Sequence, residues 1–211
     1  MKLLVMDTSC KTAMAAVCEE GNVLASIQIQ DQKTHSVKLL PAVKYILAAA
    51  GVSSSELGLV AVTNGPGSYT GLRIGVTTAK AFAYSLGIPL IGLNTLETLA
   101  AACAAGEEQL VCPMIDARRM EVYTAFFDRN NQQVIDTKAE IVDENSFADL
   151  LAGHKIYFFG NGSDKVRMLL TAPNAHFMGQ VETSARHMIP LAEELFGRQE
   201  FVDVAYFEPF Y

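Results

Sequence analysis

Apolar and polar residues follow one another along the chain in two patterns, one typical of strands and one typical of helices. Short apolar runs that end at Gly, Asn, Asp or Ser predict strands, and apolar residues three or four positions apart predict helices. The Gly21-Asn22 pair predicts a hairpin turn. In the first half we expect strands at residues 3–6, 14–18, 23–29, 57–63 and 90–93, and helices at 34–50, 72–86 and 95–105.

The second half repeats this order of elements. We expect strands at residues 111–115, 121–127, 133–135, 156–159 and 175–177, and helices at 147–151, 164–170 and 184–196. Each half also ends its first strand with an acid, Asp7 or Asp116, and has a loop rich in Gly and Asn after its fourth strand. We infer an ancient duplication that made two small α/β domains, 1–105 and 106–211, with room for the last residues to return to the first domain. The cleft between the halves is then the expected ligand site.

The composition indicates a globular chain that can bury a core. Of its 211 residues, 50% are hydrophobic and 18% are charged, which excludes intrinsic disorder for most of the chain. The 16 Lys and Arg stand against 23 Asp and Glu, which gives a net charge of −7. This balance excludes a protein that binds nucleic acid on its own, because such proteins need a surplus of positive charge.

Neither a metal site nor an export signal is visible in the sequence. The four His include no two at a spacing of three or four, and the four Cys include no C-x-x-C pair, so we expect no zinc or redox site. Only the four apolar residues 3–6 precede Asp7, which is fewer than the ~7 to 15 of a signal peptide. No apolar run reaches the ~18 residues of a membrane span. We expect a soluble, cytoplasmic protein with no cofactor and no membrane contact.

Two short segments carry candidate chemistry. The run Gly65-Pro66-Gly67-Ser68 leads a strand into a helix, where backbone N–H groups can bind an anion, or where the glycines make a turn and let helix and strand pack closely. Asp7-Thr8-Ser9 ends a strand, which is where α/β folds bind ligands, although an Asx-turn explains the same residues. The candidate anion or nucleotide cleft consists of Asp7, Thr8, Ser9, Gly65, Gly67 and Ser68.

The helix at 72–86 is apolar on nearly all sides, so it needs a second partner besides one sheet. That partner is either the neighbouring helix of the same domain or another subunit. If it is another subunit, this helix and the helix at 34–50 pair with the same two helices of a second subunit to form a four-helix bundle. The expected partner-binding residues are Val43, Leu47, Leu72, Val76, Ala79, Phe82, Ala83 and Leu86.

Three segments together resemble the bacterial TsaB (YeaZ) family, and the likeness spans essentially the whole chain. They are Asp7-Thr8-Ser9; the run from Asn64 to Gly75, which includes Gly65-Pro66-Gly67-Ser68-Tyr69-Thr70-Gly71, together with Ala79-Lys80; and Asp116-Ala117-Arg118-Arg119-Met120-Glu121-Val122-Tyr123. The resemblance implies an α/β fold with two ribonuclease H-like domains, as in the actin, hexokinase and acetate kinase (ASKHA) superfamily.

The resemblance also implies a function. Members of the family are noncatalytic subunits that bind and activate TsaD, together with TsaE, for threonylcarbamoyl transfer to the tRNA adenosine next to the anticodon. It implies that one helical face of the N-terminal domain serves both for a homodimer and for TsaD, so that the two compete. The net charge of −7 separately predicts that tRNA binds only to the assembled complex, because it repels a polyanion.

Two departures from catalytic relatives indicate that catalysis has been lost. TsaD-like subunits carry two His four positions apart for a metal, whereas here His35 is followed at that spacing by Leu39. Kinases of the superfamily need small residues in a second phosphate loop, where this chain has Arg118 and Arg119. We therefore expect a pseudoenzyme in which these two arginines form a candidate RNA-contacting rim. The alternative is a small-molecule kinase or ATPase of the same superfamily.

Overall fold

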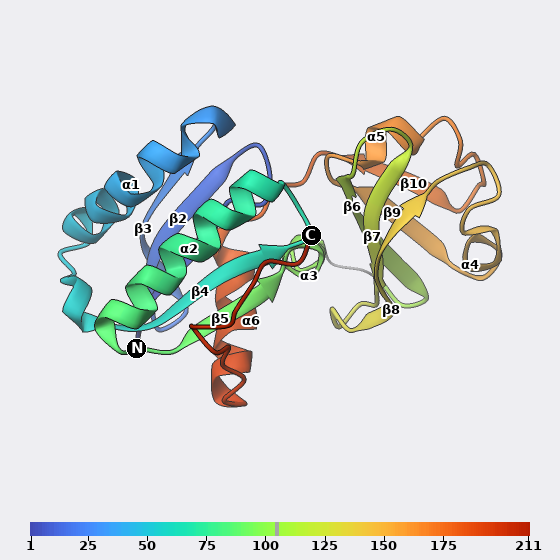
Figure 1. The fold of residues 1–211 in the computed structure, drawn as a ribbon. Helices are drawn as coiled ribbons and strands as arrows, with labels where there is room; N and C mark the ends of the chain where they lie inside the picture. The colour runs from blue at the N-terminus through green and yellow to red at the C-terminus, as the bar shows by residue number, and fades with distance from the viewer. Residues whose placement is uncertain (104–105) are drawn as a thin grey trace. The chain divides into compact units, whose positions relative to one another are not determined.

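The computed structural model describes residues 1–103 and 106–211. The chain forms two compact α/β units, each built around one five-stranded sheet (Figure 1). Unit 1 comprises Met1–Thr95 and Thr183–Tyr211, and unit 2 comprises Leu96–Glu182. The chain therefore leaves unit 1 once and returns to it.

The sheet of unit 1 has the strand order β3-β2-β1-β4-β5. Its strands are β1 (Lys2–Asp7), β2 (Ala13–Glu19), β3 (Asn22–Ile29), β4 (Leu57–Gly65) and β5 (Leu90–Asn94). The first three form an antiparallel meander, and β1, β4 and β5 are parallel. The expected hairpin is confirmed, but its turn residues are Glu20 and Gly21, because Asn22 already pairs with Glu19. Both turn residues have positive φ, as tight two-residue hairpin turns require.

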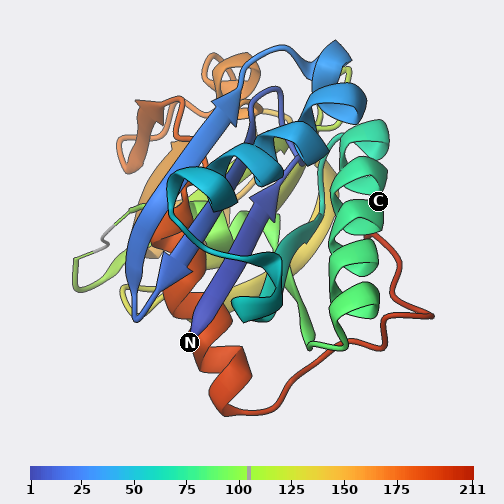
Figure 2. The same cartoon turned by 90° about the vertical axis from the view of Figure 1, so that its left-hand side faces the viewer.

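Helices cover both faces of this sheet (Figures 1 and 2). On one face, α1 (His35–Ala49) contacts β2 and β3, and α2 (Tyr69–Leu86) contacts β4 and β1. On the other face, α6 (Ala185–Gly197) contacts β1, β2, β3 and β5. Two 3₁₀ turns, η1 (Gln32–Thr34) and η2 (Ser54–Glu56), precede α1 and β4. The apolar sides of α1 and α2 pack on the sheet and form the main core of the unit.

Unit 2 repeats the topology of unit 1. Its strand order is β10-β9-β6-β7-β8, which, read from β8, has the same sequence of antiparallel and parallel neighbours as the first sheet. Its elements are α3 (Thr95–Ala100), β6 (Gln109–Asp116), β7 (Glu121–Phe127), β8 (Gln133–Ile141), α4 (Ala148–Gly153), β9 (Lys155–Phe159), α5 (Ser163–Val166) and β10 (Ala175–Gly179). The repeated topology confirms the two-fold α/β architecture expected from the sequence.

The units are divided differently from the expected domains 1–105 and 106–211. Leu96, Leu99 and Ala100 of α3 pack into a core cluster with Phe127 and Phe159 of unit 2. The last helix, α6, buries its apolar side on the sheet of unit 1. Each sheet thus receives a helix from the other half of the chain, because a buried sheet needs cover on both faces. The final residues of the expected helix at 95–105, and with them the expected boundary, lie at 104–105, outside the described residues.

Two elements of unit 2 differ in length from the expectation. Strand β8 extends to Ile141 rather than to residue 135, because its backbone pairs with β7 along a stretch whose side chains are mostly polar. Helix α5 ends at Val166 rather than near residue 170. Within the part of the chain that the structure describes, every helix is too short or too polar to cross a bilayer.

Candidate functional site

The candidate loops meet where β1 and β4 end and α2 begins. Strand β1 ends at Asp7, strand β4 ends at Gly65, and Ser68 is the N-cap of α2. The Ser68 hydroxyl oxygen accepts a hydrogen bond from Gly71 N at 3.2 Å and another from Gln32 Nε2 at 2.8 Å. This is the usual N-cap interaction, in which a side-chain oxygen satisfies a free N–H group of the first helical turn.

Asp7 is fully buried and holds three hydrogen-bond donors of unit 1. Its Oδ1 accepts from Ser9 N at 2.8 Å and from Thr63 Oγ1 at 2.5 Å, and its Oδ2 accepts from Thr183 Oγ1. Thr63 belongs to β4, and Thr183 stands where the chain returns to unit 1 before α6. A buried carboxylate needs such partners, so Asp7 joins β1, β4 and the segment that leads into α6.

The glycines of the loop and of α2 allow a close backbone approach. A Cβ atom at Gly67 would lie 2.5 Å from Ser9 O, and a Cβ atom at Gly71 would lie 2.1 Å from Thr8 O. Hydrogen bonds hold the same contact: Thr8 Oγ1 donates to Gly71 O at 2.7 Å, and Ser68 N donates to Ser9 O at 2.6 Å. The start of α2 therefore rests directly on the segment that follows β1.

The C-terminal segment covers the other side of the loop. Phe210 N donates to the carbonyl of Asn64 at 2.7 Å, and the Tyr211 ring lies 4.5 Å from the Tyr69 ring. Lys80 Nζ donates to the carbonyl of Phe207 at 2.9 Å. These contacts agree with the interpretation that the glycines allow close packing. The six residues expected to form an anion or nucleotide cleft make a packed junction in unit 1, in which Asp7, Thr8, Ser9 and Gly65 are buried and Gly67 and Ser68 are half-buried.

The structure corrects the expected partner-binding residues. Most of them face the sheet and belong to the core of unit 1, so they are not available to a partner. The buried ones are Val43, Leu47, Leu72, Val76, Ala79 and Ala83, whereas Phe82 and Leu86 are half-buried. The reason is that both helices carry apolar residues on two sides, and the sheet covers the side that we had assigned to the partner.

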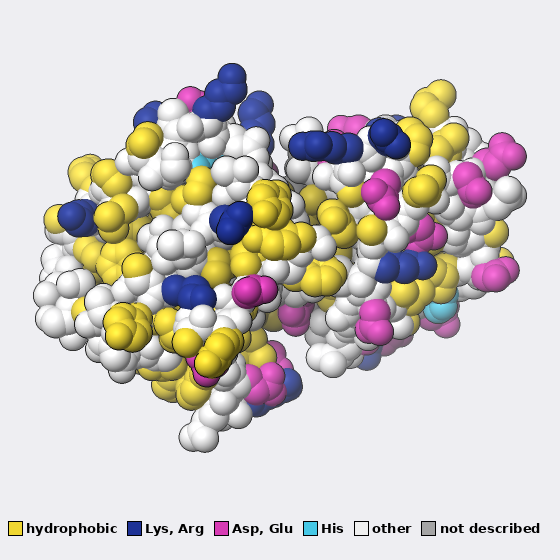
Figure 3. All heavy atoms as spheres, viewed as in Figure 1, with side chains coloured by type: hydrophobic (Ala, Val, Ile, Leu, Met, Phe, Trp, Pro, Cys, Tyr) yellow, Lys and Arg dark blue, Asp and Glu magenta, His cyan; other side chains and the backbone are white. Residues whose placement is uncertain are grey.

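The opposite side of these two helices is exposed. We call it the outer helical face and define it by Leu40 and Lys44 of α1 and by Arg73, Thr77, Ala81 and Tyr84 of α2, all of them exposed. Leu40 is 45% exposed and Tyr84 is 82% exposed. Figure 3 shows hydrophobic side chains over both helices, with Lys and Arg scattered among them. The residues expected from the sequence lie on the inner side of the same two helices, because helical spacing fits either side.

Unit 2 presents its two arginines in the turn between β6 and β7. Arg118 and Arg119 are exposed and both have positive φ. Asp116 organises the turn, because its Oδ1 accepts hydrogen bonds from Arg118 N at 2.9 Å and from Lys165 Nζ. Burial opposes ionisation of Asp116, but the hydrogen bonds from Lys165 and Arg118 outweigh it and lower the pKa of this carboxyl below its ordinary value. The turn therefore presents a cluster of positive charge around one acid.

His35 at the start of α1 is a core residue. Its ring is fully buried, Nε2 lies 3.3 Å from the carbonyl oxygen of Ile29, and Nδ1 has no hydrogen-bond partner. Leu39 is buried as well. Burial also raises the pKa of the Cys18 thiol to about 12, as in an unreactive core cysteine. Among the described residues, no three His, Cys, Asp or Glu come together as metal ligands.

Comparison with known proteins places this geometry in context. A family model described as TsaD, tRNA N6-adenosine threonylcarbamoyltransferase, matches residues 22–206. The tRNA threonylcarbamoyladenosine biosynthesis protein TsaB of Bacillus subtilis is 42% identical over 131 residues, which are 62% of this chain and 57% of that protein. The chain thus matches less than two thirds of that relative's length.

Solved structures agree over the full length. The crystal structure of an uncharacterized protein with similarity to peptidase YEAZ from Pseudomonas aeruginosa matches with a TM-score of 0.84 and 26% identity, covering 100% of this chain and 98% of that one. An activator of 2-hydroxyisocaproyl-CoA dehydratase from Clostridium difficile matches with a TM-score of 0.52 and 10% identity, covering 95% and 97%, and this likeness shows the fold alone. The fold class expected from the sequence, an α/β fold with two domains, is confirmed.

Proposed function

Because the chain belongs to the TsaB (YeaZ) family, we propose that it takes part in the biosynthesis of threonylcarbamoyladenosine in tRNA as a noncatalytic subunit. In this proposal it binds and activates TsaD, together with TsaE, for threonylcarbamoyl transfer to the adenosine next to the anticodon. The names of its relatives support the pathway, and the outer helical face supports the mode of action.

The outer helical face carries the proposal. The inner sides of α1 and α2 already fill the core of unit 1, yet Leu40, Ala81 and Tyr84 remain exposed on the outer side. Exposed apolar and aromatic side chains that lie together mark protein interfaces, and tyrosine is a frequent anchor in them. Lys44 and Arg73 are exposed on the same two helices and can supply a polar rim. A second copy of the chain can use the same face, so homodimer and TsaD complex should exclude each other.

The noncatalytic role rests on Asp7. In the proposed function this carboxylate is a structural group, because it accepts hydrogen bonds from Ser9, Thr63 and Thr183 of unit 1 and its side chain is fully buried. The alternative of a small-molecule kinase or ATPase would require such a group to face a ligand. Turnover of ATP by the isolated chain, abolished by Asp7→Asn with the fold intact, would favour that alternative.

RNA enters the proposal only through the complex. The net charge of −7 opposes the approach of a polyanion, so Arg118 and Arg119 act as local contacts for tRNA that TsaD already holds. Double substitution to Ala should weaken tRNA binding by the complex and leave TsaD binding unchanged. Tight binding of tRNA by the isolated chain at ~0.15 M salt would contradict this part.

The main test compares two exposed tyrosines, one within the outer helical face and one outside it. Tyr84→Ala removes an anchor of the outer helical face, whereas Tyr45→Ala removes another exposed ring, from α1. Both residues are more than half exposed. We expect Tyr84→Ala to weaken TsaD binding about tenfold and to lower threonylcarbamoyl transfer in a mixture with TsaD, TsaE and tRNA. Tyr45→Ala should change neither. Equal effects of the two variants would place the interface elsewhere.

A further inference from the structure

Strand β3 forms an open edge of the sheet in unit 1. It is the terminal strand in the order β3-β2-β1-β4-β5, and the nine residues from Asn22 to Gln30 include no charged residue and no Pro. Proteins usually protect a sheet edge with Lys, Pro or covering elements, because unpaired backbone groups bind another strand. An uncharged edge of this length therefore needs an explanation.

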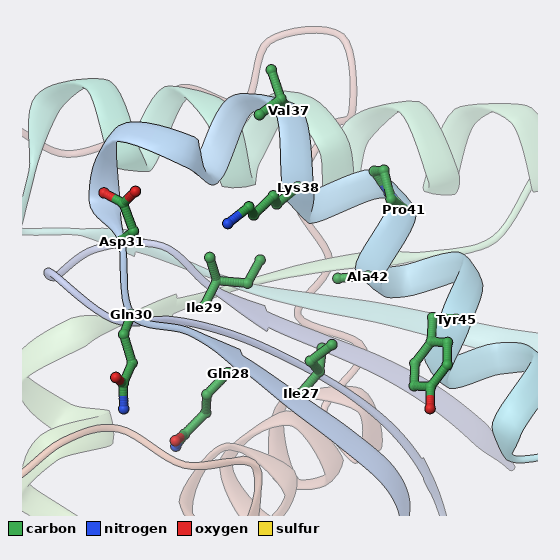
Figure 4. A pocket seen from close by; sticks show the side chains of 10 residues that line it. All are labelled: Ile27, Gln28, Ile29, Gln30, Asp31, Val37, Lys38, Pro41, Ala42 and Tyr45. Carbon is green, nitrogen blue, oxygen red and sulfur yellow. The ribbon is translucent and has the colours of Figure 1, made fainter.

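One hollow lies beside β3 on the face that α1 covers (Figure 4). It has a volume of about 640 Å³. Ile27 and Ile29 point from β3 toward α1, and Gln28 and Gln30 point the other way. From the helix, Pro41 and Tyr45 complete an apolar wall, and Lys38 extends over Ile29. This hollow fits apolar side chains with one cation at its rim.

A second hollow lies on the opposite face of the same strand. Its volume is about 470 Å³, and it lies between β3 and the start of α6. Its walls are more polar, with Ser26 of β3 and Ser184 and Arg186 next to it. Ile27 and Gln28 line both hollows. The edge is therefore open on both faces at one place, which is what an added strand requires, since its side chains alternate between the two faces of the sheet.

The whole chain has a net negative charge, whereas each of the two hollows has a cation among its lining residues. Lys38 and Arg186 form no ion pair within the described residues, and both lie at a hollow. The acid among the lining residues, Asp31, accepts a hydrogen bond from Lys33 N and lies on the α1 face. The α6 face thus offers an exposed cation with no acid among its lining residues.

We propose that β3 and these two hollows, the β3 edge site, bind an extended peptide that adds a strand to the sheet and alternates apolar with acidic side chains. Backbone hydrogen bonds to β3 provide affinity, and alternate side chains provide specificity. The apolar side chains enter the hollow beside Pro41 and Tyr45, and the acidic ones face Arg186. A second copy of this chain fits less well, because its own β3 carries no acid to meet Arg186. The site uses another side of α1 than the outer helical face and does not depend on the proposed function.

The test uses fluorescently labelled synthetic peptides of about ten residues, the upper length of ordinary strands. One peptide alternates Val with Glu, a second alternates Val with Lys, and a third is the Val-Glu peptide with a central Pro, which removes a backbone donor. Anisotropy gives the affinity, and amide shifts of the isotope-labelled full chain identify the binding segment. We expect the Val-Glu peptide to bind best and to shift the amides of residues 23–30.

Charge reversal supplies the matched comparison. Arg186→Glu should weaken the Val-Glu peptide about tenfold and strengthen the Val-Lys peptide, because a fully reversed charge changes the sign of the contact. Arg198→Glu, at the other end of α6, should change neither affinity. Equal binding of all three peptides, shifts confined to other segments, or no binding at about 1 mM peptide would overturn the proposal. Self-association through β3 that excludes the Val-Glu peptide would also overturn it, in favour of a second copy.

Discussion

Substitution of Gly71 by Ala distinguishes a packed junction from an anion-binding loop. Gly71 lies in the first turn of α2, where Ala is normally preferred over Gly by about 1 kcal/mol. In this structure its added Cβ atom would stand 2.1 Å from Thr8 O, well inside the 3.0 Å that real Cβ contacts essentially never undercut. The neighbour is backbone, so it cannot rotate away as a flexible side chain would. Helix propensity therefore predicts that Gly71→Ala stabilises the fold, whereas packing predicts that it destabilises it.

The magnitude follows from the contacts that must move. Overpacking of a buried contact costs about 1 to 3 kcal/mol. Displacement of α2 also lengthens the bonds from Thr8 Oγ1 to Gly71 O and from Ser68 N to Ser9 O, each worth about 1 kcal/mol. These losses exceed the gain in helix propensity. We expect a net loss of roughly 2 kcal/mol in the free energy of unfolding.

The assay is urea unfolding followed by circular dichroism, with no nucleotide or partner present. Gly197→Ala is the matched control, because Gly197 ends α6 in the same unit and an added Cβ meets no atom within 4 Å. The control should be neutral or slightly more stable. If Gly71→Ala is as stable as the parent chain, the packing interpretation is refuted and the anion-binding interpretation is favoured.

Three further predictions test single residues. Ala83→Glu should prevent folding, because Ala83 is 1% exposed and an unpaired buried charge costs several kcal/mol. The control variant Ala81→Glu should fold, and circular dichroism spectra of the two variants test this difference. Burial, and then the charge of Arg186, lowers the pKa of His187. The unfolded state therefore binds more protons, and the free energy of unfolding should fall as pH drops below about 6.5. His187→Gln should reduce this dependence on pH, as measured by urea unfolding at several pH values. Asp7→Asn should cost about 1.5 to 3 kcal/mol and Asp116→Asn under about 1 kcal/mol, again by urea unfolding.

Most strands and helices could be predicted from the sequence, because their apolar spacing is local information. Strand β4 and helices α1 and α2 lie within two residues of the expected limits except where α2 begins at Tyr69. The division into units could not be predicted in the same way. Helix α3 follows β5 directly in the chain, but its Leu96 and Leu99 pack in unit 2. The local sequence pattern does not indicate which of two sheets an amphipathic helix covers.

The two sides of α1 and α2 show a second limit of prediction from the sequence. Leu40, Val43 and Leu47 all fit one helical pattern, yet Leu40 is exposed and the other two are buried. When a helix carries apolar residues on two sides, its sequence does not indicate which side packs on the sheet. Small residues supply the missing signal. Gly71 and Gly75, together with Ala79 and Ala83, lie on the buried side of α2, where small side chains let the helix approach β1 closely.

The two acids that end β1 and β6 show how one motif acquires two roles. Asp7 is fully buried and accepts from Thr63 of β4, whereas Asp116 is exposed and pairs with Lys165 beside Arg118. The difference lies in their neighbours. Unit 1 surrounds its acid with neutral hydroxyl donors, which suits a buried structural anion, and unit 2 surrounds its acid with cations at the surface, where they remain open to a polyanion. The duplicated fold has therefore kept the position of the acid and separated a stabilising role from a surface role.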